Sequence, residues 1–210
     1  MANVRTAAST RWAGVPVARR KDERREMLVR AAFALFGEHG EGALTVRAVC
    51  RRAELHTRYF YENFADTDEL LAAVYDQEAT ALADILARSL EEAGPDPEAR
   101  SRAGIRSVLQ YITDDPQRGR VLFFEARGNE VLAARRRAAS TALLEALVAM
   151  GSGEPELPVL ISATMFTGAM TELAQQWADG RLGRDLDAVV DQAVELSVAM
   201  YASTAQRLPT

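Results

Sequence analysis

Apolar residues recur at helical spacing through nearly the whole chain, and this period constrains the fold more than any other feature. Between residues 19 and 39 the apolar residues of one helix face are Leu28, Ala31, Ala32, Leu35 and Phe36. No segment shows the strict alternation of apolar and polar residues that a half-buried strand requires. We therefore predict an all-α fold with nine helices.

Capping residues mark where several of these helices begin and end. Asp66 and Glu69 have the spacing of a capping box, and Asp96-Pro97 places an N-cap before a proline whose missing N–H costs nothing. Asp115-Pro116 repeats that start, and Gly40 is a typical helix stop. The predicted helices span about 19–39, 45–52, 56–64, 66–93, 96–114, 115–127, 129–150, 158–180 and 185–205.

The net charge of −5 is the sum of two halves of opposite sign. Up to residue 65 the chain has 12 Lys and Arg against 7 Asp and Glu, and the remainder has 13 against 23. Such asymmetry indicates a nucleic-acid-binding part joined to a part with another task, and a solvated basic tail is the alternative.

Composition excludes several classes of protein. A single cysteine, Cys50, allows neither an intramolecular disulfide nor a Cys-rich zinc site. The N-terminus lacks the apolar core of a secretory signal, and no stretch approaches the eighteen uncharged apolar residues of a membrane span. The sequence has no Gly-rich phosphate loop, nucleophile elbow or HExxH motif. We expect a cytoplasmic protein that is not an enzyme and needs neither cofactor nor metal.

The segment from Thr45 to Phe64 has the parts of a helix-turn-helix, with two short helices joined by Ala53-Glu54-Leu55 and braced by the helix before them. In such a motif the second helix enters the major groove, and hydrogen-bond donors at helix starts contact phosphates. Thr45 opens the first short helix. The second begins with four side chains that can donate hydrogen bonds: His56, Thr57, Arg58 and Tyr59.

This segment resembles the DNA-binding domain of the TetR family of bacterial regulators. The resemblance covers residues 27–71 closely, and the rest of the chain is similar only in length and helical layout. The matching positions are Ala31-Ala32, Leu35-Phe36, Gly40, Leu44-Thr45-Val46, Ala53, Phe60-Tyr61, Phe64 and Leu70-Leu71.

The resemblance implies a role for each matching position. Thr57, Arg58 and Tyr59 would face base edges, Thr45, Tyr61 and Asn63 would contact the DNA backbone, and a small core would contain Phe36, Val49, Leu55, Phe60 and Phe64. The full set of candidate DNA-binding residues is Thr45, Arg47, His56, Thr57, Arg58, Tyr59, Tyr61, Asn63 and Thr67. Alternatives stay open: Thr45 and His56 as helix caps only, Tyr61 as a core residue, and Arg58 on phosphate or in solvent.

The sequence departs from the family pattern at several of these positions. Glu54 occupies a turn position where the family usually has Gly, and a left-handed backbone there costs about 1 kcal/mol for another residue. The family often has Ser or Thr at His56, Gly at Arg58 and Thr at Tyr59, and it usually has a phosphate-binding Lys at Thr67. These changes affect the operator sequence and the contact list rather than the fold.

We divide the chain into a basic arm (1–18), a helix-turn-helix domain (19–65) and a ligand-binding and dimerisation domain (66–210). The arm and the start of the first helix have a basic character, and this stretch either enters a minor groove or is a solvated tail. The basic residues in question are Arg5, Arg11, Arg19, Arg20, Lys21, Arg24 and Arg25.

The last two predicted helices are apolar on more than one side and need partners on more than one side. We expect them to pair with their symmetry mates in a homodimer, and central helices of a monomer are the alternative. We also expect a cavity for a small apolar ligand among the middle helices, lined by Tyr111, Phe123, Phe124, Met165, Phe166 and Trp177, or these are plain core residues. Glu172 is a candidate polar anchor in that cavity or faces solvent.

The sequence-based function is therefore a transcriptional regulator, by default a repressor, that binds a palindromic double-stranded operator and is released by a small ligand. The second hypothesis is a helical ligand carrier or interaction module without specific DNA binding.

Overall fold

The computed structural model describes residues 17–124, 129–149 and 157–205, and this part of the chain is helical without strands. Arg5 and Arg11 of the predicted arm lie outside it. The helices are α1 (Val17–His39), α2 (Val46–Arg52), α3 (Thr57–Tyr61), α4 (Thr67–Glu92), α5 (Pro97–Asp114), α6 (Pro116–Gly119), α7 (Glu130–Ala149), α8 (Leu157–Ala178) and α9 (Leu186–Ala205). A 3-10 turn, η1 (Glu41–Ala43), and a π-helical segment, η2 (Arg120–Phe124), complete them.

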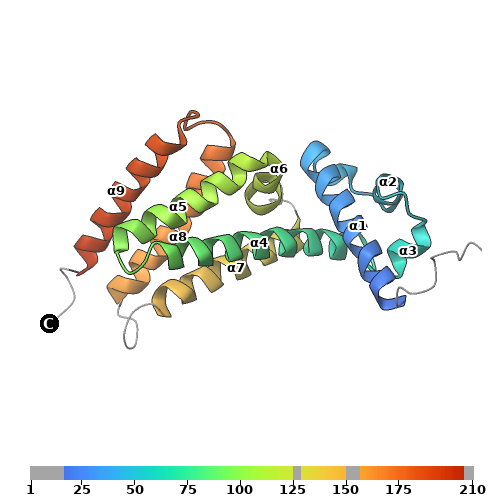
Figure 1. Ribbon diagram of the computed structural model, residues 1–210, viewed down its shortest axis with the longest axis horizontal. Helices are drawn as coiled ribbons and strands as arrows, with labels where there is room; N and C mark the ends of the chain where they lie inside the picture. The colour runs from blue at the N-terminus through green and yellow to red at the C-terminus, as the bar shows by residue number, and fades with distance from the viewer. Residues whose placement is uncertain (1–16, 125–128, 150–156, 206–210) are drawn as a thin grey trace, which may run out of the picture.

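Helices α1–α3 form a small unit at one end of an elongated molecule, and we call it the N-terminal unit (Figure 1). The long helix α4 leaves this unit and runs beside α5 and α7, while α8 and α9 lie at the opposite end (Figure 1). The all-α prediction and its nine α-helices are confirmed for the described residues. The predicted helix from Asp115 is shorter than expected, because α6 passes into η2 within four residues.

The predicted caps explain where three helices begin. Asp66 accepts a hydrogen bond from the backbone N–H of Glu69 at 2.8 Å, and the Glu69 carboxylate accepts one in return from the N–H of Ala65 at 2.6 Å. Asp96 accepts from the N–H of Ala99 at 2.8 Å, and Asp115 accepts from that of Gln117 at 3.0 Å. Each aspartate satisfies a donor that the helix itself leaves unpaired.

The buried apolar residues form two clusters. The first is continuous from the N-terminal unit into the rest of the molecule, since it joins α1–α4 to residues of α5, η2 and α7. Its members beyond α4 are Tyr111, Val121, Leu122 and Leu132. The second cluster joins α5 to α8 and α9 around Ile105, Leu109, Ala174 and Val190. The N-terminal unit is thus packed onto the helices behind it and does not hang from a linker.

Polar contacts reinforce this junction. Arg120 of η2 donates to the carbonyl oxygen of Gly37 in α1 at 2.6 Å, and Asn129, just before α7, donates to the carboxylate of Glu41 at 2.7 Å. Gly37 packs so closely on α6 that a Cβ there would lie 2.5 Å from the side chain of Gln117. Helices α6 and η2 are therefore in direct contact with α1.

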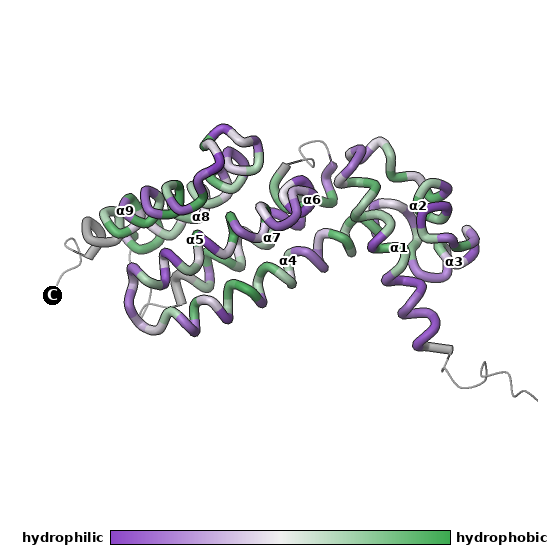
Figure 2. Tube along the Cα trace, turned by 45° about the horizontal axis from the view of Figure 1, so that its top comes forward, coloured by the Kyte–Doolittle hydropathy of each residue, from purple (hydrophilic) through white to green (hydrophobic). Residues whose placement is uncertain are grey.

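Apolar positions follow the buried sides of α4 and the junction, whereas the start of α1 is strongly hydrophilic (Figure 2). Helix α8 differs, because its apolar residues are largely exposed. It is long and apolar enough to cross a membrane by length and composition, with a mean hydropathy of 1.3. Glu172 interrupts this helix, so α8 does not contain the eighteen consecutive uncharged apolar residues whose absence the sequence analysis reported.

Candidate nucleic-acid interface

The interface begins at Thr45, the N-cap of α2. The Thr45 hydroxyl oxygen accepts a hydrogen bond from the N–H of Ala48 at 3.2 Å, which confirms the predicted cap. Val49 and Cys50 turn inward from the same short helix, and burial raises the pKa of the Cys50 thiol. Arg47 is exposed on the opposite side. The fold thus anchors α2 by its apolar side and leaves its start open to solvent.

The turn between α2 and α3 has the backbone shape that the sequence predicted. Glu54 has a φ of 55°, in the left-handed region that favours glycine. The N–H of Leu55 then donates to the carbonyl oxygen of Cys50 at 2.9 Å and closes the turn. Ala53 is buried beneath it. The strained residue, Glu54, lies in the turn that sets the angle between α2 and α3.

Helix α3 has a buried side and an exposed side. Phe60 is 0% exposed, and its ring lies 5.9 Å from that of Phe64, so this pair fixes the helix against the core. The adjacent Tyr61 is 63% exposed, which excludes the alternative of a core residue. Thr57 and Arg58 are also exposed. The predicted small core is confirmed, with Leu55 packed at its edge.

The exposed residues at the start of α3 follow the turn that ends α2. His56 is the N-cap of α3 by backbone conformation, but its side chain makes no capping hydrogen bond. Its imidazole is exposed, as are the side chains of Thr57 and Arg58. The polar side chains at the start of α3 therefore face solvent and do not pack in the protein's interior.

Three predicted contact residues are placed differently from this row. Tyr59 is half-buried, with the guanidinium of Arg24 4.5 Å from its ring centre. The Asn63 amide donates to the carbonyl oxygen of Tyr59 at 2.7 Å, which ties it to the end of its own helix. Thr67 is half-buried at the first position of α4. Tyr59 and Asn63 therefore make contacts within the protein that hold α3 in place, and they are less exposed than Thr57 and Arg58.

The charges around the interface are partly paired. Arg52 donates two hydrogen bonds to Glu38, at 2.9 and 2.6 Å, and this pairing holds the pKa of the Glu38 carboxyl below its usual range. Arg58 and Arg24 both lie beside Glu62, at 3.1 and 3.6 Å. Sequence reasoning missed Glu62, although the four-residue spacing from Arg58 is a typical helical ion-pair signal.

The candidate ligand residues do not share one environment. Tyr111 belongs to the first buried cluster and Trp177 to the second, where its indole N–H donates to Thr113 at 3.0 Å. The backbone of Phe123 accepts from Gln175 at 3.0 Å, and the side chain of Phe124 lies outside the described residues. The other three candidates are on α8: Phe166 is half-buried, Met165 is 60% exposed, and Glu172 is exposed and accepts from Gln176.

A buried polar group near Tyr111 escaped sequence analysis. The Tyr111 hydroxyl donates to the carboxylate of Glu78 at 2.8 Å, and the Arg118 guanidinium lies 3.7 Å from that carboxylate. Burial, and then the bond to Glu78, raise the pKa of Tyr111, so its hydroxyl stays protonated. Glu78 follows Leu71, Val74 and Tyr75 on the buried side of α4, and that position in the apolar stripe was the available signal.

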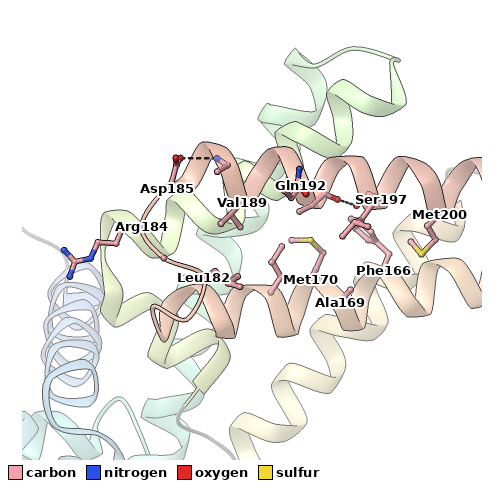
Figure 3. A pocket seen from close by; sticks show the side chains of 15 residues that line it. Phe166, Ala169, Met170, Leu182, Arg184, Asp185, Val189, Gln192, Ser197 and Met200 are labelled. Carbon is pink, nitrogen blue, oxygen red and sulfur yellow. Dashed lines mark hydrogen bonds between the residues drawn. The ribbon is translucent and has the colours of Figure 1, made fainter.

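A groove of about 540 Å³ lies between α8 and α9 (Figure 3). Met170 and Phe166 line it from α8, and Val189 and Leu196 from α9, while the Arg184 side chain points away from it (Figure 3). The groove is open and mostly apolar. Phe166 is the one predicted ligand residue among those that line it.

A braced helix pair with an exposed polar row, carried on an all-helical body, defines a helix-turn-helix DNA-binding regulator. Residues 28–74 match the model of the family described as bacterial regulatory proteins, tetR family. Residues 28–74 therefore form a DNA-binding domain of this family, and the described part of the chain has the fold of TetR-like regulators.

Solved structures with the same fold cover most of both chains. One is a TetR-like transcriptional regulator from Rhodococcus sp. RHA1, at 20% identity, a TM-score of 0.71 and coverage of 90% of this chain and 99% of that one. Another is the fatty acid degradation regulator FadR from Bacillus halodurans, at 19% identity and a TM-score of 0.70, with coverage of 83% of this chain and 94% of that one. A third is the multidrug binding protein EbrR complexed with imidazole, at 18% identity and a TM-score of 0.68, with coverage of 84% of this chain and 94% of that one.

Proposed function

We propose that this regulator binds a palindromic operator as a homodimer, represses transcription in that state, and leaves the operator when a small apolar ligand binds its C-terminal helices. The observation that carries the proposal is the division of α3, where Phe60 is fully buried and the adjacent Tyr61 is 63% exposed. An exposed polar row on a rigidly held short helix is what insertion into a major groove requires.

The exposed residues suggest how the operator is bound. The Thr45 oxygen already accepts from Ala48, and its hydroxyl hydrogen remains to be donated to a phosphate. Capping and phosphate contact are therefore compatible at Thr45. We assign Arg47 and Tyr61 to the DNA backbone, and Thr57 and Arg58 to base edges.

The dimer is proposed from the distribution of exposed apolar side chains. Eight large apolar or aromatic side chains are exposed among the described residues, and six of them belong to α8, α9 or the loop between them. They are Leu157, Leu160, Ile161, Met165, Leu182 and Leu196. An apolar area of this kind on a DNA-binding protein indicates a protein interface. A second copy covers it best, because a twofold dimer also suits a palindromic operator.

The same dimer accounts for the apolar character of α8. Only 17% of its most apolar eighteen-residue window is buried within one chain. A membrane would cover the same surface, but α8 is linked through α5 and the long helix α4 to a unit with an exposed polar DNA-facing row. We therefore assign the exposed face of α8 to the partner subunit and the protein to the cytoplasm.

The ligand response is supported by two of the structural neighbours, a fatty acid degradation regulator and a multidrug binding protein. We place the ligand beside Tyr111 and Phe123, which pack in the first buried cluster, with Glu78 as a polar group that orients it. A ligand that displaces Arg118 from Glu78 would move α6, and the contacts of α6 and η2 with Gly37 would transmit that movement to α1.

The test is a mobility shift with DNA that flanks the protein's own gene, repeated at several salt concentrations. The proposal predicts saturable binding of a dimer to one sequence, with affinity falling steeply as salt rises. Binding that is equal on all sequences would favour the helical carrier without specific DNA binding. A thermal-shift screen of small apolar compounds, followed by addition of each stabilising compound to the complex, then tests whether ligand releases the operator.

A further inference from the structure

Glu62 lies between two arginines at the end of α3. Its Oε1 is 3.1 Å from Nε of Arg58 in the same helix, and its Oε2 is 3.6 Å from a terminal nitrogen of Arg24 in α1. Each carboxylate oxygen therefore faces one guanidinium. An acidic residue at the end of a recognition helix is unfavourable for phosphate binding, so its presence there calls for another role.

The two arginines have different environments. The Arg24 side chain is 22% exposed and its guanidinium lies 4.5 Å from the centre of the Tyr59 ring, whereas the Arg58 side chain is 75% exposed. The Arg58 guanidinium lies 5.1 Å from the same ring. Tyr59 thus supports both cations, and the less mobile Arg24 holds Glu62 from α1.

The atom that Glu62 contacts on Arg58 decides what this arginine can do. The ion pair uses Nε, and within the described part of the chain no hydrogen bond engages the two terminal nitrogens. Those two nitrogens can donate side by side to O6 and N7 of guanine. A guanidinium held at Nε therefore keeps its bidentate end available while it loses rotational freedom.

We infer that Glu62 is a positioning residue that sets operator specificity: it orients Arg58 toward a base and weakens the attraction of Arg24 and Arg58 to phosphates of unrelated DNA. The inference rests on the proposed operator binding. On unrelated sequences the carboxylate opposes phosphate contact and Arg58 gains no base. On the operator the base contact uses the two free nitrogens, so the ion pair persists.

Replacing Glu62 by Gln removes one negative charge from each protomer of the dimer. We expect the affinity for random-sequence DNA to rise about tenfold at low salt. The slope of log affinity against log salt concentration should steepen by about one released ion per protomer. The affinity for the operator stays within about twofold, because the added attraction is offset by poorer orientation of Arg58. The ratio of specific to non-specific affinity therefore falls about tenfold.

Glu26→Gln is the matched control, because Glu26 forms a simple exposed pair with Arg30 on α1 at 3.5 Å. It removes the same charge from the same unit and is expected to raise both affinities equally, which leaves the ratio unchanged. A ratio preserved in Glu62→Gln, or lowered equally in Glu26→Gln, overturns the inference. Wild-type protein without operator preference would instead overturn the proposed function.

A second variant tests whether Glu62 acts through Arg58. In an Arg58→Ala background, Glu62→Gln should leave the operator affinity no worse, since there is no guanidinium left to orient. Arg58→Lys keeps the charge but offers one nitrogen, so it should lose operator preference while it retains binding to random DNA. Unchanged operator preference in Arg58→Lys contradicts the bidentate role. Thermal unfolding of each variant checks that the fold persists.

Discussion

The two ends of the molecule distribute apolar side chains in opposite ways. In the N-terminal unit Phe36, Phe60 and Phe64 are almost fully buried, and the exposed positions of α2 and α3 are mostly polar or charged. At the other end, Met165 and Leu196 are 60% and 72% exposed on α8 and α9. Within one chain, the large apolar side chains of the first region are buried, whereas several of those in the second region stay exposed to solvent.

The difference shows which partner each region needs. A buried core beneath a polar row needs no second copy to cover it and is suited to a charged, hydrated partner such as DNA. An exposed apolar face costs free energy in water until another apolar surface covers it. Folding of one chain therefore completes the first region, and the proposed dimer would cover the second.

The largest expected effect distinguishes buried from exposed residues within α3. Phe60→Ala leaves a cavity in the core of the N-terminal unit and should lower the free energy of unfolding by about 3–5 kcal/mol. Tyr61→Ala, at the adjacent exposed position, should change it by no more than about 0.5 kcal/mol while weakening operator binding. Chemical denaturation of both variants measures this, and equal destabilisation would contradict the division of α3.

The next effect concerns the opposite end. Leu196→Glu places a charge on the exposed apolar face and should raise the dissociation constant of the dimer about a hundredfold, equivalent to about 3 kcal/mol. Light scattering after size-exclusion chromatography, over a range of concentrations, measures the change. Leu143→Glu is the control, since Leu143 is exposed on α7 rather than on α8 or α9. A stable Leu196→Glu dimer would place the interface elsewhere.

Arg58→Ala should weaken operator binding by about 1–3 kcal/mol while the fold and the dimer persist. The reason is the loss of a bidentate base contact from an exposed side chain. Fluorescence anisotropy with labelled operator measures it, and Arg137→Ala on α7 serves as a control for a lost positive charge. Identical operator affinity in wild type and Arg58→Ala would remove Arg58 from the base-contacting surface.

A smaller and opposite effect is expected at the turn. Glu54 has a φ of 55°, so Glu54→Gly relieves left-handed strain and should raise the free energy of unfolding by about 0.5–1 kcal/mol. Glu54→Ala keeps the strain and should give no such gain. A lower melting temperature for Glu54→Gly than for wild type would show that the Glu54 side chain stabilises the turn.

The smallest effect is a dependence on pH. The hydrogen bonds from Arg52 lower the pKa of Glu38 below its ordinary value of 4.5. The pair therefore contributes stability above pH 4.5, and this contribution is lost as the pH falls through the lowered pKa. The stability difference between wild type and Glu38→Gln should shrink between pH 7 and pH 3. A difference that grows on acidification would contradict the assignment.

Much of the fold could be predicted because local signals were strong. The caps at Asp66, Asp96 and Asp115 and the period of apolar residues specified where helices lie, and both depend only on neighbours in sequence. The polar row at Thr57 and Arg58 was expected from the run of hydrogen-bond donors that opens the second short helix and from the resemblance to the TetR family. Helix α6 was predicted too long: it ends at Gly119 and passes into η2, whose Arg120 contacts Gly37 of α1.

What the sequence could not predict depends on long-range contacts. Tyr59 looked like a base-contacting residue, but Arg24 from another helix lies over its ring. Glu78 is a polar residue whose partner is set by the fold, since it accepts a hydrogen bond from Tyr111, 33 residues away. Aromatic type alone could not show that Tyr111 and Trp177 lie in separate clusters.

The central claim is that a dimer presents the exposed side of α3 twice to one face of a duplex. Hydroxyl-radical footprinting of the wild-type protein on the sequence that it selects from random duplexes tests this directly. We predict two protected half-sites related by twofold symmetry, separated by about 34 Å or a multiple of it, with protection lost in Arg58→Ala and Tyr61→Ala. Protection of a single half-site, or protection that survives both substitutions, would contradict it.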